Sequence, residues 1–427
     1  MRPNSPYWLT INSSLVNTMH QETNILFKKV SSSEMNKVRQ KKQLLSLLRT
    51  HGSASAPDLS KWLKTSLPTC IVLLNDLINS GYVKNFGIGE SSGGRKPNLY
   101  GLPEDGFYVI SCDLARFSAT IVIVDCYHKF VTPVLEIDTH IDDPHLVDKM
   151  YEAANQLITG HNIPNEKIFG LGVDMPGLIN SKIGINYTIK DKKRQNIGRD
   201  LRQRFNKHVY IENDARMHAF GEFYFGSAKG YKDAIIIHWS WGLGLGIFIN
   251  GQLCSGKNGF AGEFSHIPIV ENGELCICGK RGCLETIASS NTIMRRVREG
   301  IADKEISSLI SQFQDHPDKV TPEDVINSAR LGDEFCISIL NEVGTAMGKG
   351  LSYIIQLMNP EVIVLSGPLS KAKQYILSPI QQSLNRFCLE KISESTQLII
   401  SDLGDQSALL GTSEMIFQKV FTEMNLL

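Results

Sequence analysis

The chain has 427 residues, enough for two or three domains. Hydrophobic residues make up 42% and charged residues 21%, as in ordinary globular proteins. No run approaches the roughly 18 uninterrupted apolar residues of a membrane span, and the first thirty residues lack the blocks of a secretion signal. The sequence therefore predicts a cytoplasmic protein without membrane insertion.

The formal net charge of zero hides an uneven distribution. Residues 1–102 carry 13 Lys+Arg and 5 Asp+Glu, whereas the remainder carries 31 and 39. A basic head on an acidic body indicates that only the head meets a polyanion. Surface charge without a function is the alternative explanation of the same split.

The first hundred residues contain three predicted helices followed by two short strands. Residues 1–34 show no sustained period and are predicted to be an extension. A helix-period stripe then runs from Met35 to Gly52, a second helix starts at Ser55, and a third is capped by Ser66 and runs to Gly81. Strands at 82–84 and 99–100 flank a glycine-rich tip. This order predicts a winged helix-turn-helix over residues 35–103.

Such a domain places its third helix in the major groove of DNA and binds two half-sites as a dimer. Polar side chains on that helix would read base edges, apolar ones would contact thymine methyl groups, and the basic tip would approach phosphates. The predicted DNA contacts are Ser66, Thr69, Ile71, Val72, Asn75, Arg95 and Lys96. Because this face is unusually apolar, packing against protein is its alternative role.

Residues 104–427 alternate strands and helices, which predicts an α/β body without a tandem repeat. The predicted strands are 107–112, 118–124, 168–173, 208–211, 234–238, 246–249, 362–365 and 397–400. The predicted helices are 145–158, 215–225, 344–358 and 408–422.

Three of the nine cysteines crowd into one short segment, Cys276, Cys278 and Cys283. This spacing is typical of metal ligands in a protein of a reducing compartment and not of the disulfide framework of a secreted protein. Thiolates at these positions of a glycine-punctuated loop can turn inward together, with His266 as a fourth ligand. Because protein would fill all four positions, the predicted Zn²⁺ is structural and not catalytic. Three free cysteines are the alternative.

The helix-turn-helix, the Gly-Gly-Arg-Lys-Pro run at 93–97 and the Cys-x-Cys-Gly-x-x-Gly-Cys-x-Glu run at 276–285 together resemble the ROK family of repressors and sugar kinases. The resemblance covers nearly the whole chain from about residue 35. It implies an actin-like, ribonuclease H-like sugar kinase fold with two lobes around a sugar cleft and a C-terminal helix that returns to the first lobe. It also implies a homodimer or tetramer.

In ROK proteins the residues that match Asn213, Asp214, Glu263, His266 and Glu285 contact the sugar, and the residue that matches Asp214 is the kinase base. The family's segment that matches Gly170–Gly177 lies beside the sugar. Taken singly, each of these residues has an ordinary alternative, such as a turn, a helix cap or a solvated carboxylate. In family order they predict a site for a sugar or phosphosugar.

Kinases cradle phosphates with backbone amides and small hydroxyl side chains, and three segments here depart from that pattern. Where the family has Asp-x-Gly-Gly-Thr, this chain has Asp113-Leu114-Ala115-Arg116-Phe117. In the family's Gly-Thr-Gly-x-Gly segment, Trp241 replaces the threonine. Of the family's Gly-Gly pair, one glycine remains here, Gly367. The predicted function is therefore a sugar-responsive repressor without catalytic residues, in which Asp214 is vestigial. The alternatives are an active hexose kinase with an appended helix-turn-helix and a regulator controlled by a protein partner.

Overall fold

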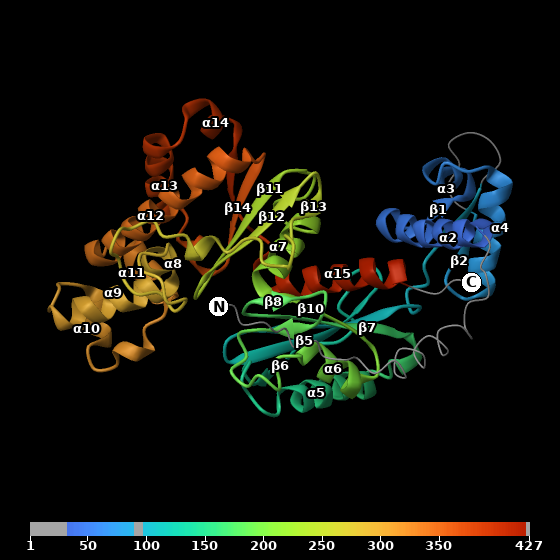
Figure 1. Ribbon diagram of the computed structural model, residues 1–427, viewed down its shortest axis with the longest axis horizontal. Coiled ribbons are helices and arrows are strands. Elements are labelled where there is room, and N and C mark those ends of the chain that lie inside the picture. The colour runs from blue at the N-terminus through green and yellow to red at the C-terminus, as the bar shows by residue number, and fades with distance from the viewer. Residues whose placement is uncertain (1–31, 89–96, 424–427) are drawn as a thin grey trace, which may run out of the picture. The chain divides into compact units, whose positions relative to one another are not determined.

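The computed structural model describes residues 32–88 and 97–423. The chain divides into two compact units: the part up to Pro103 together with the chain from Phe421 onward, and a larger body, Glu104–Val420. None of the described helices combines the length and apolar character that crossing a membrane requires. Figure 1 labels the helices and strands.

The first unit contains three helices, α2 (Ser32–His51), α3 (Ala56–Trp62) and α4 (Leu67–Asn79). The Ser55 and Ser66 hydroxyls accept hydrogen bonds from backbone amides in the first turns of α3 and α4, so both starts predicted from the sequence are correct. α2 ends at His51, before Gly52 with φ 75°. The helices share a core of leucines, namely Leu44, Leu45, Leu48, Leu59, Leu73, Leu74 and Leu77.

A three-stranded antiparallel sheet completes this unit, in the order β1 (Ala54–Ser55), β3 (Asn98–Gly101), β2 (Lys84–Ile88). The pattern of the sequence predicted β2 and β3 approximately but not β1, because two residues carry no readable alternation. The last turn of α15 (Ser407–Glu423) belongs to the same unit, where the Lys42 ammonium donates to the Thr422 carbonyl at 2.6 Å.

The body contains two five-stranded sheets with the same topology. In the first lobe, β10 (His208–Asn213), β7 (Ile168–Met175) and β4 (Tyr108–Leu114) are parallel, and β4, β5 (Ser118–Asp125) and β6 (Leu135–Asp138) are antiparallel. The second lobe repeats this arrangement: β13 (Gln252–Leu253), β12 (Leu243–Ile249) and β11 (Ala234–Trp239) are antiparallel, followed in parallel by β14 (Val362–Ser366) and β15 (Gln397–Ile400). The repeat is one of topology, which is why no repeat of residues indicated it.

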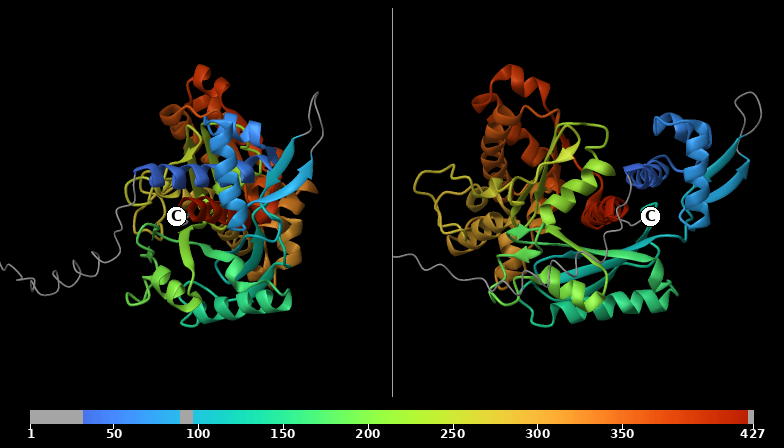
Figure 2. Two further views of the ribbon diagram at one scale, coloured as in Figure 1. Left: turned by 90° about the vertical axis from the view of Figure 1, so that its right-hand side faces the viewer. Right: turned by 45° about the vertical axis from the view of Figure 1, so that its right-hand side comes forward.

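Helices cover both faces of the first sheet, as both views of Figure 2 show. α5 (Leu146–Gly160) and α6 (Ile197–Phe205) pack on one face, and α15 packs on the other. Gly172 of β7 makes room for α15, because a Cβ there would lie 2.5 Å from Ile416. A short hairpin, β8 (Ile179–Asn180) with β9 (Ile185–Asn186), and a 3-10 turn, Asn165–Lys167, complete this lobe.

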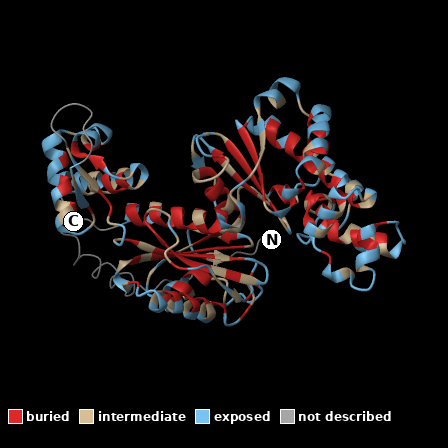
Figure 3. Cartoon of the chain, turned by 180° about the vertical axis from the view of Figure 1, so that it is seen from behind, coloured by how far each residue is buried: buried red, intermediate tan, exposed pale blue. Residues whose placement is uncertain are grey.

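The second sheet packs on α7 (Asp214–Tyr224) on one side and on a helical layer on the other. That layer comprises α8 (Glu285–Ala288), α9 (Ser290–Ala302), α10 (Ser308–Phe313), α11 (Pro322–Arg330), α12 (Glu334–Met358), α13 (Gln374–Phe387) and α14 (Glu390–Ser395). Short 3-10 turns lie at Phe264–His266, Pro317–Lys319, Pro368–Ala372 and Gly404–Gln406. Buried residues fill the central strands of both sheets, shown in red in Figure 3.

Two expectations about element limits were wrong. α12 begins at Glu334, ten residues before the predicted start, because Asp333 caps it through the Cys336 amide. β12 begins at Leu243, three residues before the predicted strand start at Gly246, so that Gly244 lies inside the strand as well as Gly246. A Cβ at either glycine would lie 2.1 Å from an alanine of α7, so these glycines allow the helix to approach the strand closely.

Candidate sugar and metal sites

Asn213 and Asp214 lie where β10 ends and α7 begins. The Asn213 side chain caps α7 through the Arg216 amide, and its Nδ2 donates to the Gly177 carbonyl at 3.2 Å. The Asp214 carboxylate accepts from the Ala215 amide at 2.8 Å. Burial is the main cause that raises the pKa of Asp214, to about 6. The structure thus places the predicted Pro-Gly segment beside two of the predicted sugar ligands.

A buried ion pair supports this junction. The Arg216 Nε donates to Glu212 Oε1 at 2.9 Å, and a second guanidinium nitrogen contacts the same oxygen. A third guanidinium nitrogen donates to the Gly259 carbonyl, which belongs to the loop before Glu263. The spacing of four residues gave no signal for this pair in the sequence, because residues four apart face each other only within a helix, and Glu212 lies in β10.

The start of β12 touches each segment that carries a predicted sugar ligand. A Cβ at Gly242 would lie 3.8 Å from the Glu285 carboxylate, and one at Gly262, next to Glu263, would lie 2.6 Å from the Leu245 carbonyl. Gly244 packs on Ala215, next to Asp214. Three stretches far apart in the sequence therefore meet along residues 242–245, at the start of β12 and immediately before it.

The side chains of His266, Cys276, Cys278 and Cys283 form one cluster that could hold a metal ion, with all four ligand atoms within 4.8 Å of one another. Cys278 Sγ lies 3.7 Å from Cys283 Sγ, and Cys276 Sγ lies 3.5 Å from His266 Nδ1. A tetrahedral zinc ion with Zn–S bonds of about 2.3 Å separates its sulfur ligands by about 3.8 Å. The donor atoms therefore fit zinc.

The backbone of this loop depends on glycine. Gly279 and Gly282 have φ of 83° and 74°, and a Cβ at Gly282 would overlap the Val270 carbonyl oxygen at 1.8 Å. The loop closes through hydrogen bonds from the Cys276 amide to the Lys280 carbonyl and from the Gly282 amide to the Glu274 carbonyl.

His266 presents its two ring nitrogens to different groups. Nδ1 faces Cys276, whereas Nε2 lies 4.0 Å from a Glu263 carboxylate oxygen. One imidazole can therefore complete the metal cluster and still face the segment of predicted sugar ligands. Glu285 follows Cys283 by two residues and starts α8. The metal cluster is therefore linked to Glu263, His266 and Glu285 through short stretches of backbone.

Two carboxyl groups, Asp113 and Asp174, lie near Asp214. Asp174, fully buried in β7, accepts a hydrogen bond from the Thr412 hydroxyl of α15 at 2.6 Å. Burial raises the pKa of Asp174 well above its usual range, and the neighbouring Asp113 carboxyl raises it further. Burial also raises the pKa of Asp113. The sequence signal for Asp174 was an acidic residue inside an otherwise apolar strand.

The segments that differ from kinase phosphate loops form turns with bulky side chains. Arg116 and Phe117 lie between β4 and β5, and Trp241 lies between β11 and β12. The Arg116 guanidinium lies 5.2 Å from the ring centre of Phe117 and 5.1 Å from that of Trp241. Gly367, with φ 86°, packs against the Trp239 backbone.

Comparison with known proteins identifies the family. The model of the ROK family matches residues 136–419. The chain belongs to the ROK family. A glucokinase of Halalkalibacterium halodurans is 32% identical over 279 residues, which cover 63% of this chain and 82% of that enzyme. A xylose repressor of Bacillus spizizenii is 29% identical over 396 residues, which cover 90% and 96%.

A solved structure described as a ROK family transcriptional regulator, a homologue of the Escherichia coli MLC protein, superposes with a TM-score of 0.78 at 24% identity. It covers 90% of this chain and 96% of its own. The predicted two-lobed, actin-like fold is therefore confirmed, and so is the predicted membership of the ROK family.

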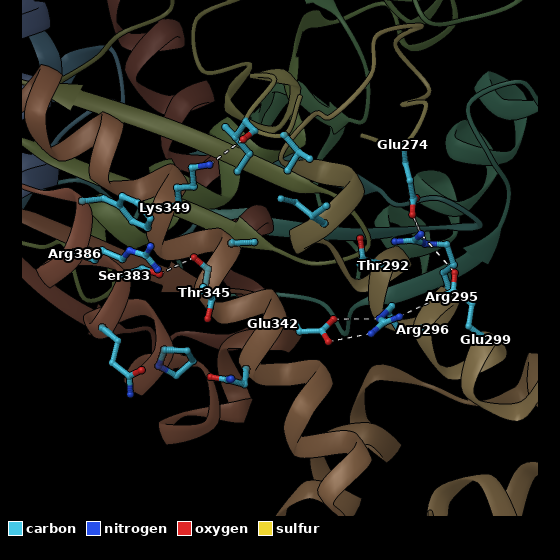
Figure 4. A pocket seen from close by; sticks show the side chains of 18 residues that line it. Glu274, Thr292, Arg295, Arg296, Glu299, Glu342, Thr345, Lys349, Ser383 and Arg386 are labelled. Atoms are coloured by element: carbon cyan, nitrogen blue, oxygen red, sulfur yellow. Dashed lines mark hydrogen bonds and ion pairs between the residues drawn. The ribbon is translucent and has the colours of Figure 1, made fainter. Parts of the chain in front are cut away.

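This ROK chain also has a surface cavity of about 890 Å³ in the second lobe, between α9, α12, α13 and the segment before the cysteines (Figure 4). None of the five predicted sugar ligands lines it. Its arginines at 295 and 296 are paired with carboxylates: Arg295 contacts Glu274, and Arg296 contacts Glu342 at 2.9 Å.

The structure places five of the seven predicted DNA contacts on one helix. Thr69, Ile71, Val72 and Asn75 are exposed on α4, opposite its buried leucines, and Ser66 is its cap. The Ser66 hydroxyl already bonds to Thr69, so its first role is to cap the helix. Arg95 and Lys96 lie outside the described residues.

Proposed function

We propose that this protein is a sugar-responsive, DNA-binding transcriptional repressor of the cytoplasm that works as a homodimer or tetramer. The observation that carries the proposal is the coverage of its relatives. The xylose repressor and the regulator structure each cover 90% of the chain, more than the body of residues 104–420 can supply. The similarity to regulators therefore includes the N-terminal unit, whereas the glucokinase covers 63%.

The N-terminal unit, residues 35–103, acts as a winged helix-turn-helix in this proposal. α4 enters the major groove, where Thr69 and Asn75 donate or accept at base edges and Ile71 and Val72 contact thymine methyl groups. The exposure of this face on α4 supports the assignment. Arg95 and Lys96 of the wing are proposed to meet phosphates.

The sugar site comprises Asn213, Asp214, Glu263, His266 and Glu285 in this proposal. Carboxylates and an amide accept from and donate to adjacent sugar hydroxyls, and their geometry discriminates epimers. The contacts of the β12 start with all three segments support one common site. A Zn²⁺ held by His266 and the three cysteines would be structural, because four protein ligands leave it no open position for water.

We also propose that ATP-dependent phosphorylation has been lost. The support is that Arg116, Phe117 and Trp241 replace the small residues with which kinases of this kind cradle phosphates. The second candidate is an active hexose kinase, favoured by the 32% identity to a glucokinase and by the retained Asp214. ATP-coupled turnover with a panel of sugars distinguishes them: a turnover above roughly 1 s⁻¹, as in typical enzymes, would support the kinase.

In the proposed mechanism, a sugar that contacts both lobes favours one arrangement of them and thereby changes the DNA affinity of the paired N-terminal units. The test starts by selecting duplexes that the full-length protein binds from a random library. The selected duplex is then titrated with protein at fixed salt, with and without each sugar. We expect one sugar to change the dissociation constant by about 5- to 150-fold. A sugar that binds the protein but leaves DNA binding unchanged contradicts the mechanism.

A pair of valine variants tests the DNA face. Val72→Asp places a negative charge on the proposed groove-facing side of α4, and Val134→Asp changes a similarly exposed valine of the body. We expect only Val72→Asp to weaken binding to the selected duplex, by about tenfold or more. Equal effects of both variants would argue that α4 is not the recognition helix.

A further inference from the structure

One arginine contacts both stretches of chain that carry predicted sugar ligands. Arg216 lies in the first turn of α7, two residues after Asp214, and its backbone amide donates to the Asn213 side chain at 3.3 Å. Its guanidinium donates to the Gly259 carbonyl, four residues before Glu263. Gly259 belongs to the loop that follows β13 in the second lobe. Arg216 therefore connects the two halves of the proposed sugar site.

The buried Glu212 orients the guanidinium for this contact. Arg216 Nε donates to Glu212 Oε1 at 2.9 Å, and the same oxygen accepts from the Asn213 backbone amide at 2.9 Å. The two side chains of the ion pair are only 4% and 10% exposed. A hydrogen bond from a charged donor is roughly twice as strong as a neutral one, and burial excludes the water that would compete for it. The pair therefore fixes both the Gly259 carbonyl and the Asn213 amide.

The orientation of Glu263 depends on the backbone that carries it. Its side chain is 48% exposed, and in the part of the chain that the structure describes no hydrogen bond fixes its carboxylate. The backbone before it is anchored at two glycines with positive φ. Gly259, with φ 85°, is held by Arg216, and Gly262, with φ 97°, packs against the Leu245 carbonyl of β12. Release of the first anchor would free the backbone that aims the Glu263 carboxylate.

Other contacts of this loop with the first lobe are weaker. The exposed Lys182 ammonium donates to the Lys257 carbonyl at 3.2 Å. The ring of Tyr187, which is 45% exposed, meets the ring of Phe260 edge-on, with 6.1 Å between their centres. Exposed hydrogen bonds compete with water and contribute little. The buried contact of Arg216 is therefore the one expected to hold the loop in register with the first lobe.

We propose that Arg216 is a positioning residue of the sugar site, which sets the distance between Asn213 in the first lobe and Glu263 in the second. The inference rests on the proposed sugar site. Because its side chain is buried, Arg216 acts through these two residues and does not touch the sugar. A sugar presents its hydroxyls at fixed spacings, and a displacement of about 1 Å at a site of this kind can cost about 100-fold. Arg216 would thus decide the affinity for the effector.

The charge of Arg216 acts on the same site. Burial is the main cause that raises the pKa of Asp214 to about 6, and the Asp113 carboxyl of β4 adds to it, whereas the Ala215 amide and the Arg216 guanidinium lower it. Asp174 of β7 is a further acidic neighbour. Without the guanidinium, the Asp214 carboxylate, the form that accepts most strongly from sugar hydroxyls, would appear at a higher pH. The pH dependence of sugar binding therefore reports this charge separately from folding.

The experiment measures sugar binding to the full-length protein by isothermal titration. The probes are glucose, mannose, galactose, xylose and N-acetylglucosamine with their phosphate esters, and the ligand that the wild type binds most tightly is used for the variants. Arg216→Met/Glu212→Gln removes the contact with Gly259 without leaving a buried charge unpaired. It should weaken that ligand by about 10- to 100-fold, while its urea midpoint stays near that of the wild type. Arg216→Lys, which keeps the charge but not the fork, should lose less.

The pH dependence provides the second measurement. Wild-type binding should strengthen as pH rises through about 6. Arg216→Met should move this transition to higher pH, and Arg216→Lys should not. Arg194→Met is the control, because the Arg194 guanidinium also donates to backbone carbonyls of the first lobe, those of Asp142 and Asp143, in a stretch without predicted sugar ligands. It should change the affinity by less than about twofold.

A folded double variant that binds the ligand as tightly as the wild type overturns the inference and leaves the sugar site intact. An equal loss of affinity in Arg194→Met, or a pH transition that moves equally in Arg216→Lys and Arg216→Met, overturns it as well. If the double variant does not fold, Arg216→Lys carries the same test, because a lysine can still pair with Glu212. A wild type that binds no member of the panel overturns the proposed sugar site itself.

Discussion

Replacing Asp214 by asparagine removes an ionisable group from a place where burial disfavours charge. The pKa of Asp214 rises from 3.8 to about 6 in the folded protein, mainly through burial. At about 1.4 kcal/mol per unit this corresponds to about 3 kcal/mol of lost stability once the carboxyl is ionised, or about 2 kcal/mol after allowance for its partial exposure. The new amide side chain keeps an oxygen that can accept from the Ala215 amide.

The sign follows from the direction of the pKa shift. Because the folded pKa lies above the unfolded one, the folded state binds the proton more tightly, and the wild type loses stability as pH rises from about 4 through about 6. Asp214→Asn should therefore raise the free energy of unfolding by about 2 kcal/mol at pH 7.5 and by well under 1 kcal/mol at pH 4. It should also weaken sugar binding, because an amide accepts hydrogen bonds from hydroxyls less strongly than a carboxylate.

Urea unfolding followed by tryptophan fluorescence at both pH values measures the change. Asp318→Asn is the control, since the Asp318 side chain is 91% exposed and should show no effect at either pH. A stabilisation of equal size at pH 4 and pH 7.5 would refute the reasoning, because ionisation would not be its cause. A destabilised Asp214→Asn at pH 7.5 would refute it too.

Three further predictions concern the supports of the site. Arg216→Met leaves the buried Glu212 unpaired and should cost about 3–5 kcal/mol in urea unfolding, whereas adding Glu212→Gln should recover most of the loss; a double variant no more stable than the single one contradicts this. Cys278→Ser should lower the melting temperature, and so should a strong chelator, which should release about one zinc per chain in a colorimetric assay. A wild-type chain purified without zinc would count against the metal site. Gly411→Ala should destabilise the body by about 1–3 kcal/mol or more, because its Cβ would lie 2.0 Å from the backbone oxygen of Met217 in α7; an unchanged melting temperature would contradict that close helix contact.

Local patterns were sufficient for the parts of this protein that depend on neighbours in the chain. The caps Ser55 and Ser66 act within one helical turn, and the cysteines with His266 span a single loop, so spacing alone indicated helix starts and a metal cluster. The family resemblance supplied the order of the sugar ligands. Neither required knowledge of long-range packing.

Only the tertiary structure decided which distant residues meet. It brought Asp174 of β7 to Thr412 of α15 and Arg116 to Trp241, pairs separated by more than a hundred residues. It also showed that Gly244 allows α7 to approach β12 closely. Periodicity reports which face of an element is buried, but it does not report what covers that face. The residue types of the sites could thus be predicted from the sequence. The contacts between distant segments, including the one between Arg116 and Trp241 that joins the two lobes, arose from tertiary packing.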